Sequence, residues 1–131
     1  MSVEVNLPEP LAELEAAFRR YEAALVSNDM VTLDALFAPG PHTIRYGIGE
    51  NLYGAAEILA FRQARPATGL ARTLSRTVIT TYGRDFGTAS TLFHRESAPG
   101  KVGRQMQSWV RFAEGWRVVA AHVSLIPEPA A

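Results

Sequence analysis

Tyr21 is the first residue whose position in the sequence points to chemistry. It lies in residues 10–28, where apolar side chains recur at steps of three and four: Leu11, Leu14, Phe18, Tyr21 and Leu25. That spacing places them on one stripe of an α-helix, and the stripe is expected to be buried. A buried tyrosine hydroxyl needs a hydrogen-bond partner or a cavity to point into. Tyr21 is therefore either a core residue bonded to a backbone carbonyl or a donor that faces a ligand.

Arginine is the second candidate for a functional group. The chain has twelve arginines and one lysine, Lys101. Arginine binds carboxylates through paired hydrogen bonds and tolerates partial burial better than lysine, so one or two of these residues could serve an anionic ligand. A GC-rich genome would give the same bias. Arg45 lies in the short strand predicted over residues 42–46, where it faces either solvent or a pocket.

Two predicted strands near the C-terminus carry further candidates. In residues 116–126, strand alternation places His122 and Ser124 on one face, after small apolar residues. This pattern suits the wall of a cavity. In residues 102–112 both faces carry polar side chains, among them Gln105. One of these faces is expected to line a pocket, and the other to meet a second subunit.

Composition and motifs disfavour several classes of function. The chain has no cysteine, and its three histidines lack the spacing of metal ligands, so no metal site is expected. A nucleophile elbow, a phosphate loop and a dinucleotide fingerprint are all missing from the sequence. A formal net charge of zero gives no general attraction to nucleic acid or to an anionic membrane. Catalysis is therefore expected to be cofactor-free and to use tyrosine, arginine and histidine in acid–base or electrostatic roles.

The location expected from the sequence is the cytoplasm. No apolar run has the length of a transmembrane helix, and the first ten residues are too acidic and too poor in hydrophobic side chains for a signal peptide.

The helices and strands that carry these residues are predicted from hydrophobic periodicity and from the glycine and proline residues that end each element. Helices are predicted over residues 10–28, 30–37 and 54–64, and strands over residues 42–46, 51–53, 70–82, 86–96, 102–112 and 116–126. Helices followed by strands joined through short turns predict an α+β domain. We expect one domain over residues 1–131, with loose tails at 1–9 and 127–131. Its three N-terminal helices should pack on a curved antiparallel sheet to form a cone with a side-chain-lined interior.

Two stretches resemble a known superfamily. RRYEAALVSNDMVTLDALFAPGPHTIRYGIGENLYGAAEI is similar to the opening of the nuclear transport factor 2-like (SnoaL-like, ketosteroid isomerase-like) superfamily, and QSWVRFAEGWRVVAAHVSLI is similar to its final hairpin. The resemblance implies the cone fold, commonly dimeric through the open sheet face. Tyr21 matches the oxyanion-hole tyrosine of ketosteroid isomerase. The isomerase's general-base aspartate should fall in TIRYG, which has no carboxylate, so steroid isomerisation is not expected.

The segments RRYEAALVSND, HTIRYG, FRQARP and GWRVVAAHVSLIP resemble a narrower group, the oxalurate- and triazine-catabolism proteins. This group includes a dicarboxyurea amidohydrolase of cyanuric acid breakdown. The resemblance implies a cofactor-free amidohydrolase in which Tyr21 and Arg45 are catalytic, and it favours the pocket for Arg45. Arg65, Gln105 and His122 are the expected substrate-binding residues, because a planar dianion needs cationic and polar partners.

The expected partners are a small anionic substrate and other copies of the chain, in a homodimer or a higher homo-oligomer. A separate amidase is a further candidate partner, because similar proteins accompany amidases. Two alternatives to hydrolysis therefore stay open. One is a non-catalytic accessory or anion-binding protein of oxalurate or purine catabolism, and the other is an isomerase or dehydratase acting on another ligand.

Overall fold

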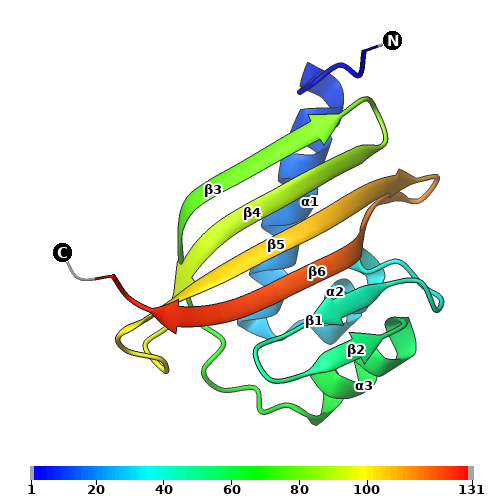
Figure 1. Cartoon of the computed structure of the whole chain (residues 1–131). Helices are drawn as coiled ribbons and strands as arrows, with labels where there is room; N and C mark the ends of the chain where they lie inside the picture. Colours follow the sequence, from blue (N-terminus) through cyan, green and yellow to red (C-terminus); the bar gives the residue numbers. More distant parts are fainter. Residues whose placement is uncertain (1, 130–131) are drawn as a thin grey trace.

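The computed structural model describes residues 2–129 and contains three helices and six strands (Figure 1). In chain order the elements are α1 (Pro8–Ser27), α2 (Met30–Leu36), β1 (Ile44–Tyr46), β2 (Asn51–Tyr53), α3 (Ala55–Ala64), β3 (Thr73–Tyr82), β4 (Phe86–His94), β5 (Lys101–Phe112) and β6 (Gly115–Pro127). The predicted α+β fold, with helices packed on a curved sheet, is confirmed. In residues 2–129, no helix combines the length and the apolarity that a membrane crossing requires.

The six strands form one sheet in the order β2-β1-β6-β5-β4-β3. All neighbouring strands are antiparallel except β1 and β6, which are parallel. In Figure 1, α1 crosses behind the long strands, while α2 and α3 lie at the end of the sheet formed by β1 and β2. The sheet therefore has an inner face, turned toward α1, and an outer face.

The core lies between α1 and the inner face of the sheet. The predicted stripe of α1 is confirmed, because Leu14, Phe18, Tyr21 and Leu25 are all buried. Trp109 of β5 is fully buried against the same cluster. The long amphipathic helix thus supplies one half of the core, and the inner side chains of β4, β5 and β6 supply the other half.

The predicted loose tails are wrong at both ends of the chain. Val5 bridges to Tyr82, and Asn6 exchanges hydrogen bonds with Thr81 at the end of β3. β3 is an edge strand, so its free backbone groups accept this short pairing. At the other end, Pro127 closes β6, and the Glu128 amide donates to Gly100. Residues 1, 130 and 131 lie outside the described residues.

Two bulges change which side chains face the core. The pairing of β5 with β6 slips between Ser108 and Trp109, which leaves Val119 of β6 without a partner. A second irregularity interrupts the pairing of β3 with β4 between Ser75 and Val78. A bulge reverses the alternation of inner and outer residues beyond it and strengthens the local bend.

Gly103 provides a test of the packing on the inner face. A Cβ at this position would lie 2.1 Å from the ring of Phe93, whereas a Cβ at Gly49 would meet nothing within 4 Å. Gly103→Ala should therefore lower the free energy of unfolding by about 1–3 kcal/mol. Gly49→Ala is the matched control and should leave it unchanged in urea denaturation. Equal stability of the two variants would contradict this account of the packing.

Candidate anion-binding site

Tyr21 is a core residue whose hydroxyl is not used by the core. Its side chain is 3% exposed. The ring packs against Phe18 and Phe37 and meets Trp109 edge-on, with 6.4 Å between the ring centroids. The hydroxyl makes no hydrogen bond within residues 2–129, so the predicted alternative of a bond to a backbone carbonyl is not observed. Aromatic packing fixes the ring and leaves the hydroxyl available as a donor.

Arg45 lies on the inner face of the sheet. Its neighbours in β1, Ile44 and Tyr46, are exposed on the outer face, and alternation along the strand turns Arg45 inward. Only 12% of its side chain is exposed, and Nη1 lies 2.9 Å from Oε1 of Glu50. The guanidinium carbon is 5.6 Å from the centroid of the Phe61 ring. Arg45 is therefore turned inward rather than toward solvent, and its pairing with Glu50 holds it there.

Arg62 and Arg65 come from the buried side of α3 and its C-cap. Their spacing from Ile58, at four and seven residues, continues one helical stripe. Arg62 is 4% exposed, and its guanidinium carbon lies 4.2 Å from the centroid of the Phe37 ring. The pKa of Arg62 is lowered to about 10, mainly by burial and to a smaller extent by the charges of Arg45 and Arg65. The same causes, burial first and Arg45 second, lower the pKa of Arg65.

Arg72 and Arg95 reach the interior from the far end of the sheet. Arg72 forms a bidentate ion pair with Glu22, at 2.8 and 2.6 Å, and its side chain is 1% exposed. Arg95 packs over the ring of Phe93. Its pKa is lowered by burial first and by the charge of Arg72 second. Arg72 and Arg95 both line an open cavity of about 880 Å³ at this end of the sheet.

Together these residues form an arginine cluster: Arg45, Arg62, Arg65, Arg72 and Arg95. Within the described residues, Glu22 and Glu50 pair with Arg72 and Arg45, and the other three arginines have no ion pair. A negative charge on Tyr21 would raise the pKa of Arg62, Arg65 and Arg95, so its hydroxyl lies within electrostatic reach of all three. Buried cations without partners are costly, and an anion is the ligand that would offset their charge.

Gln105 joins this group from β5, as the sequence predicts. It is 1% exposed, and its amide oxygen accepts a hydrogen bond from Nη2 of Arg72 at 3.0 Å. Gln107, two residues further along, is also buried on the inner face. Of the five predicted site residues, Tyr21, Arg45, Arg65 and Gln105 therefore belong to one interior.

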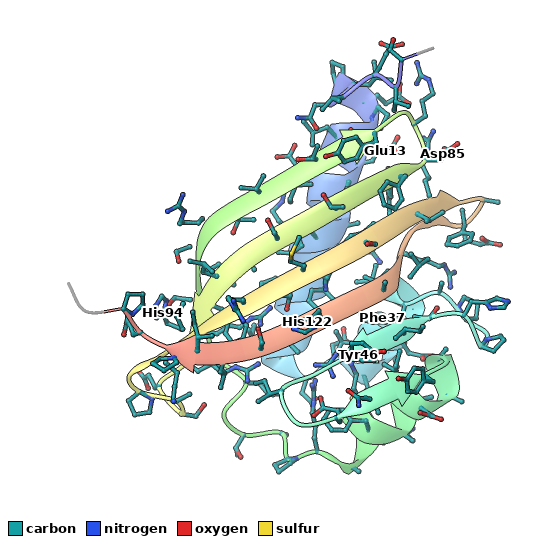
Figure 2. All side chains as sticks on the ribbon, in the orientation of Figure 1. Glu13, Phe37, Tyr46, Asp85, His94 and His122 are labelled. Atoms are coloured by element: carbon teal, nitrogen blue, oxygen red, sulfur yellow. The ribbon has the colours of Figure 1, made fainter. Side chains whose placement is uncertain are left out.

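The prediction that His122 lines the pocket is wrong. The bulge at Val119 reverses the alternation, so Ala121 and Val123 face inward and His122 is exposed. Its ring meets the ring of Tyr46, with 6.5 Å between centroids, and Figure 2 shows both side chains on the face of the sheet turned away from α1. The sequence alone places no bulge at this point, and strict alternation then assigns His122 to the wrong face.

The sequence prediction missed Arg62, Arg72, Arg95 and Gln107. The spacing of Arg62 from Ile58 was a usable signal for burial, and Gln107 shares the strand parity of Gln105. Arg72 had no local signal, because its partner Glu22 is 50 residues away. In residues 2–129, no three histidine, aspartate or glutamate side chains gather as metal ligands.

The architecture is the nuclear transport factor 2-like fold, also called cystatin-like. A ketosteroid isomerase-like protein from Erwinia carotovora superposes with a TM-score of 0.70 at 17% identity, over 93% of this chain and 100% of that one. At that identity the likeness shows the fold alone.

The model of the AtzH-like family matches residues 3–129, and the chain belongs to this family. A protein of unknown function from Pectobacterium atrosepticum is 59% identical, with a TM-score of 0.91, over 93% of this chain and 94% of that one. A cystatin-like fold protein from Burkholderia xenovorans is 48% identical, with a TM-score of 0.93, over 98% and 100%. No curated protein sequence matches the chain.

Two arginine variants test whether the cluster is held at the expense of stability. Arg62→Met keeps an unbranched apolar stem but removes a buried cation without an ion pair, so the free energy of unfolding should rise by about 1–3 kcal/mol. Arg72→Met leaves the carboxylate of Glu22 without its partner and should lower this free energy by about 3 kcal/mol. Urea denaturation at low salt measures both values. A loss of stability in Arg62→Met would contradict the account of an uncompensated charge.

Proposed function

We propose that the protein is a cofactor-free amidohydrolase that acts on a small carboxylated urea, such as dicarboxyurea, in cyanuric acid or ureide nitrogen catabolism. One observation carries the proposal: the Tyr21 hydroxyl has no partner within the described residues and lies within electrostatic reach of three buried or half-buried arginines that have no ion pair in that part of the chain. Membership of the AtzH-like family supports the same conclusion.

The substrate class follows from the charge of the interior. Three arginines of the cluster have no ion pair, and a flat molecule with two carboxylates would offset most of that charge. Guanidinium groups bind carboxylates in plane through two hydrogen bonds, which orients a planar ligand as well as holding it. A small ureide with a carboxylate at each end has this shape and this charge.

The proposed chemistry uses Tyr21 and Arg45 on the scissile amide. Water adds to the carbonyl carbon, and the charge that develops on the oxygen is stabilised by the Tyr21 hydroxyl and the Arg45 guanidinium. The C–N bond then breaks. The leaving nitrogen takes a proton from Tyr21, which regains one from the attacking water. Arg62, Arg65 and Arg95 hold the carboxylates while these bonds change.

A second function, binding of a small anion without turnover, is favoured by one observation. The interior carboxylates that the structure describes, Glu22 and Glu50, are held in ion pairs, and His122 lies on the outer face. Neither type of group is free there to activate water. A protein with this interior could bind a small anion beside a separate amidase of oxalurate or purine catabolism.

Tyr21→Phe tests the hydrolase directly. The hydroxyl makes no hydrogen bond to residues 2–129, so its removal should leave stability unchanged and should lower kcat on dicarboxyurea by roughly 100- to 1,000-fold. Arg45→Met should lower kcat to a similar extent. Tyr82→Phe, which removes an exposed hydroxyl from the end of β3, is the matched control and should keep full activity.

The assay follows product formation from dicarboxyurea and oxalurate by the purified protein, together with its thermal unfolding. Full activity in Tyr21→Phe would contradict the mechanism. Tight anion binding with no turnover, and co-purification with an amidase, would instead establish the second function.

A further inference from the structure

The two buried glutamines of β5 have amide groups whose orientation is fixed by their neighbours. Nη2 of Arg72 donates to Oε1 of Gln105 at 3.0 Å, and Nε1 of Trp109 donates to Oε1 of Gln107 at 3.1 Å. Guanidinium and indole groups only donate hydrogen bonds. A rotated amide would place two donors against each other, so in both residues the oxygen must face its neighbour and the NH₂ group must point elsewhere.

Both NH₂ groups lack a hydrogen-bond acceptor. Gln105 and Gln107 are 1% and 2% exposed, and neither Nε2 atom has a partner within the described residues. Nearly all buried polar groups in folded proteins are hydrogen-bonded, so two such donors on one strand need an explanation. A ligand that supplies oxygen acceptors would satisfy both of them.

The place of the two glutamines in the fold connects them to the candidate site. They lie two residues apart on the inner face, so their backbones are about 7 Å apart, a distance that a small flat molecule can span. Gln105 contacts Arg72 of the arginine cluster, and Gln107 contacts Trp109, whose ring meets the Tyr21 ring edge-on. Through these two contacts the glutamines lie next to the arginine cluster and to the aromatic residues that hold Tyr21.

We propose that Gln105 and Gln107 are ligand-binding donors that recognise the carbonyl and carboxylate oxygens of a small anion. Arg72 and Trp109 act as positioning residues, because they keep the amide oxygens turned away from the ligand. Glu22 in turn holds Arg72 through its bidentate ion pair. This inference rests on the proposed function for its substrate class and deepens it: the ligand presents oxygen atoms, and not N–H groups, to β5.

Replacement of each glutamine by glutamate separates this role from a structural one. Gln105→Glu and Gln107→Glu keep an oxygen that can accept from Arg72 or Trp109, but they replace the free donor with a second acceptor. Each change should weaken the binding of malonate, a small dicarboxylate used as the probe, by roughly ten-fold or more in calorimetry. Gln63→Glu is the matched control: the same change at an exposed position of α3, beside Arg62, should alter the affinity less than two-fold.

The side-chain amide resonances give a second readout. In ¹⁵N-labelled protein, the NH₂ signals of Gln105 and Gln107 should shift when malonate is added, while the signal of Gln63 should not. The three glutamate variants assign these signals by their loss. Trp109→Phe should weaken malonate binding and reduce the malonate-induced shift of the Gln107 NH₂ signal, while the shift of the Gln105 signal persists. A general disruption of the core would instead change the shifts of both signals.

These results distinguish the inference from the proposed function. Unchanged malonate affinity in both glutamate variants, or amide signals that do not move, would overturn the inference even if dicarboxyurea is hydrolysed. Failure of the wild-type protein to bind malonate would overturn it as well. Binding through the two glutamines without turnover of dicarboxyurea or oxalurate would uphold the inference and reject the hydrolase.

Discussion

The arginine cluster brings more positive charge into this fold than its two glutamate partners neutralise. Arg62 is buried and Arg65 and Arg95 are half-buried, all three without ion pairs in the described part of the chain, and burial lowers the pKa of each. Water screens such charges poorly once they are buried, so they repel one another and the folded state must tolerate that repulsion. An interior of this kind is poorly explained as a packing solution, since apolar side chains of similar size would fill it at lower cost. The proposed function gives the charge a role, because a bound anion would offset it.

The fold tolerates this charge because aromatic rings of the core lie beside the arginine cluster. The rings of Tyr21, Phe37 and Trp109 pack against one another between α1 and the sheet. The guanidinium groups of Arg62 and Arg95 lie over the rings of Phe37 and Phe93, where the negative face of an aromatic ring offsets part of the charge. Rigid packing of the rings fixes the positions of the polar groups, as electrostatic stabilisation of a reacting anion requires.

The sequence predicts the elements better than it predicts the site. The stripe of α1 and the order of helices and strands depend on local periodicity, and the structure has them as predicted. Side-chain alternation in so short a strand does not decide whether Arg45 points to solvent or to the interior. Only the family resemblance favours the interior. His122 was assigned to the wrong face because a single bulge, which depends on how β5 and β6 curve together, reverses the strand parity. The contact of Arg72 with Glu22 and Gln105 joins three distant segments, and no local pattern carries that information.

The central claim is that the interior beside Tyr21 binds a small carboxylated anion, and a crystal structure of the protein grown with malonate tests it most directly. Electron density for malonate is expected between the Tyr21 hydroxyl and the arginine cluster, with its carboxylate oxygens within hydrogen-bond distance of the guanidinium groups of Arg62, Arg65 or Arg95. Malonate found only on the outer surface, with the interior arginines arranged as in its absence, would contradict the account.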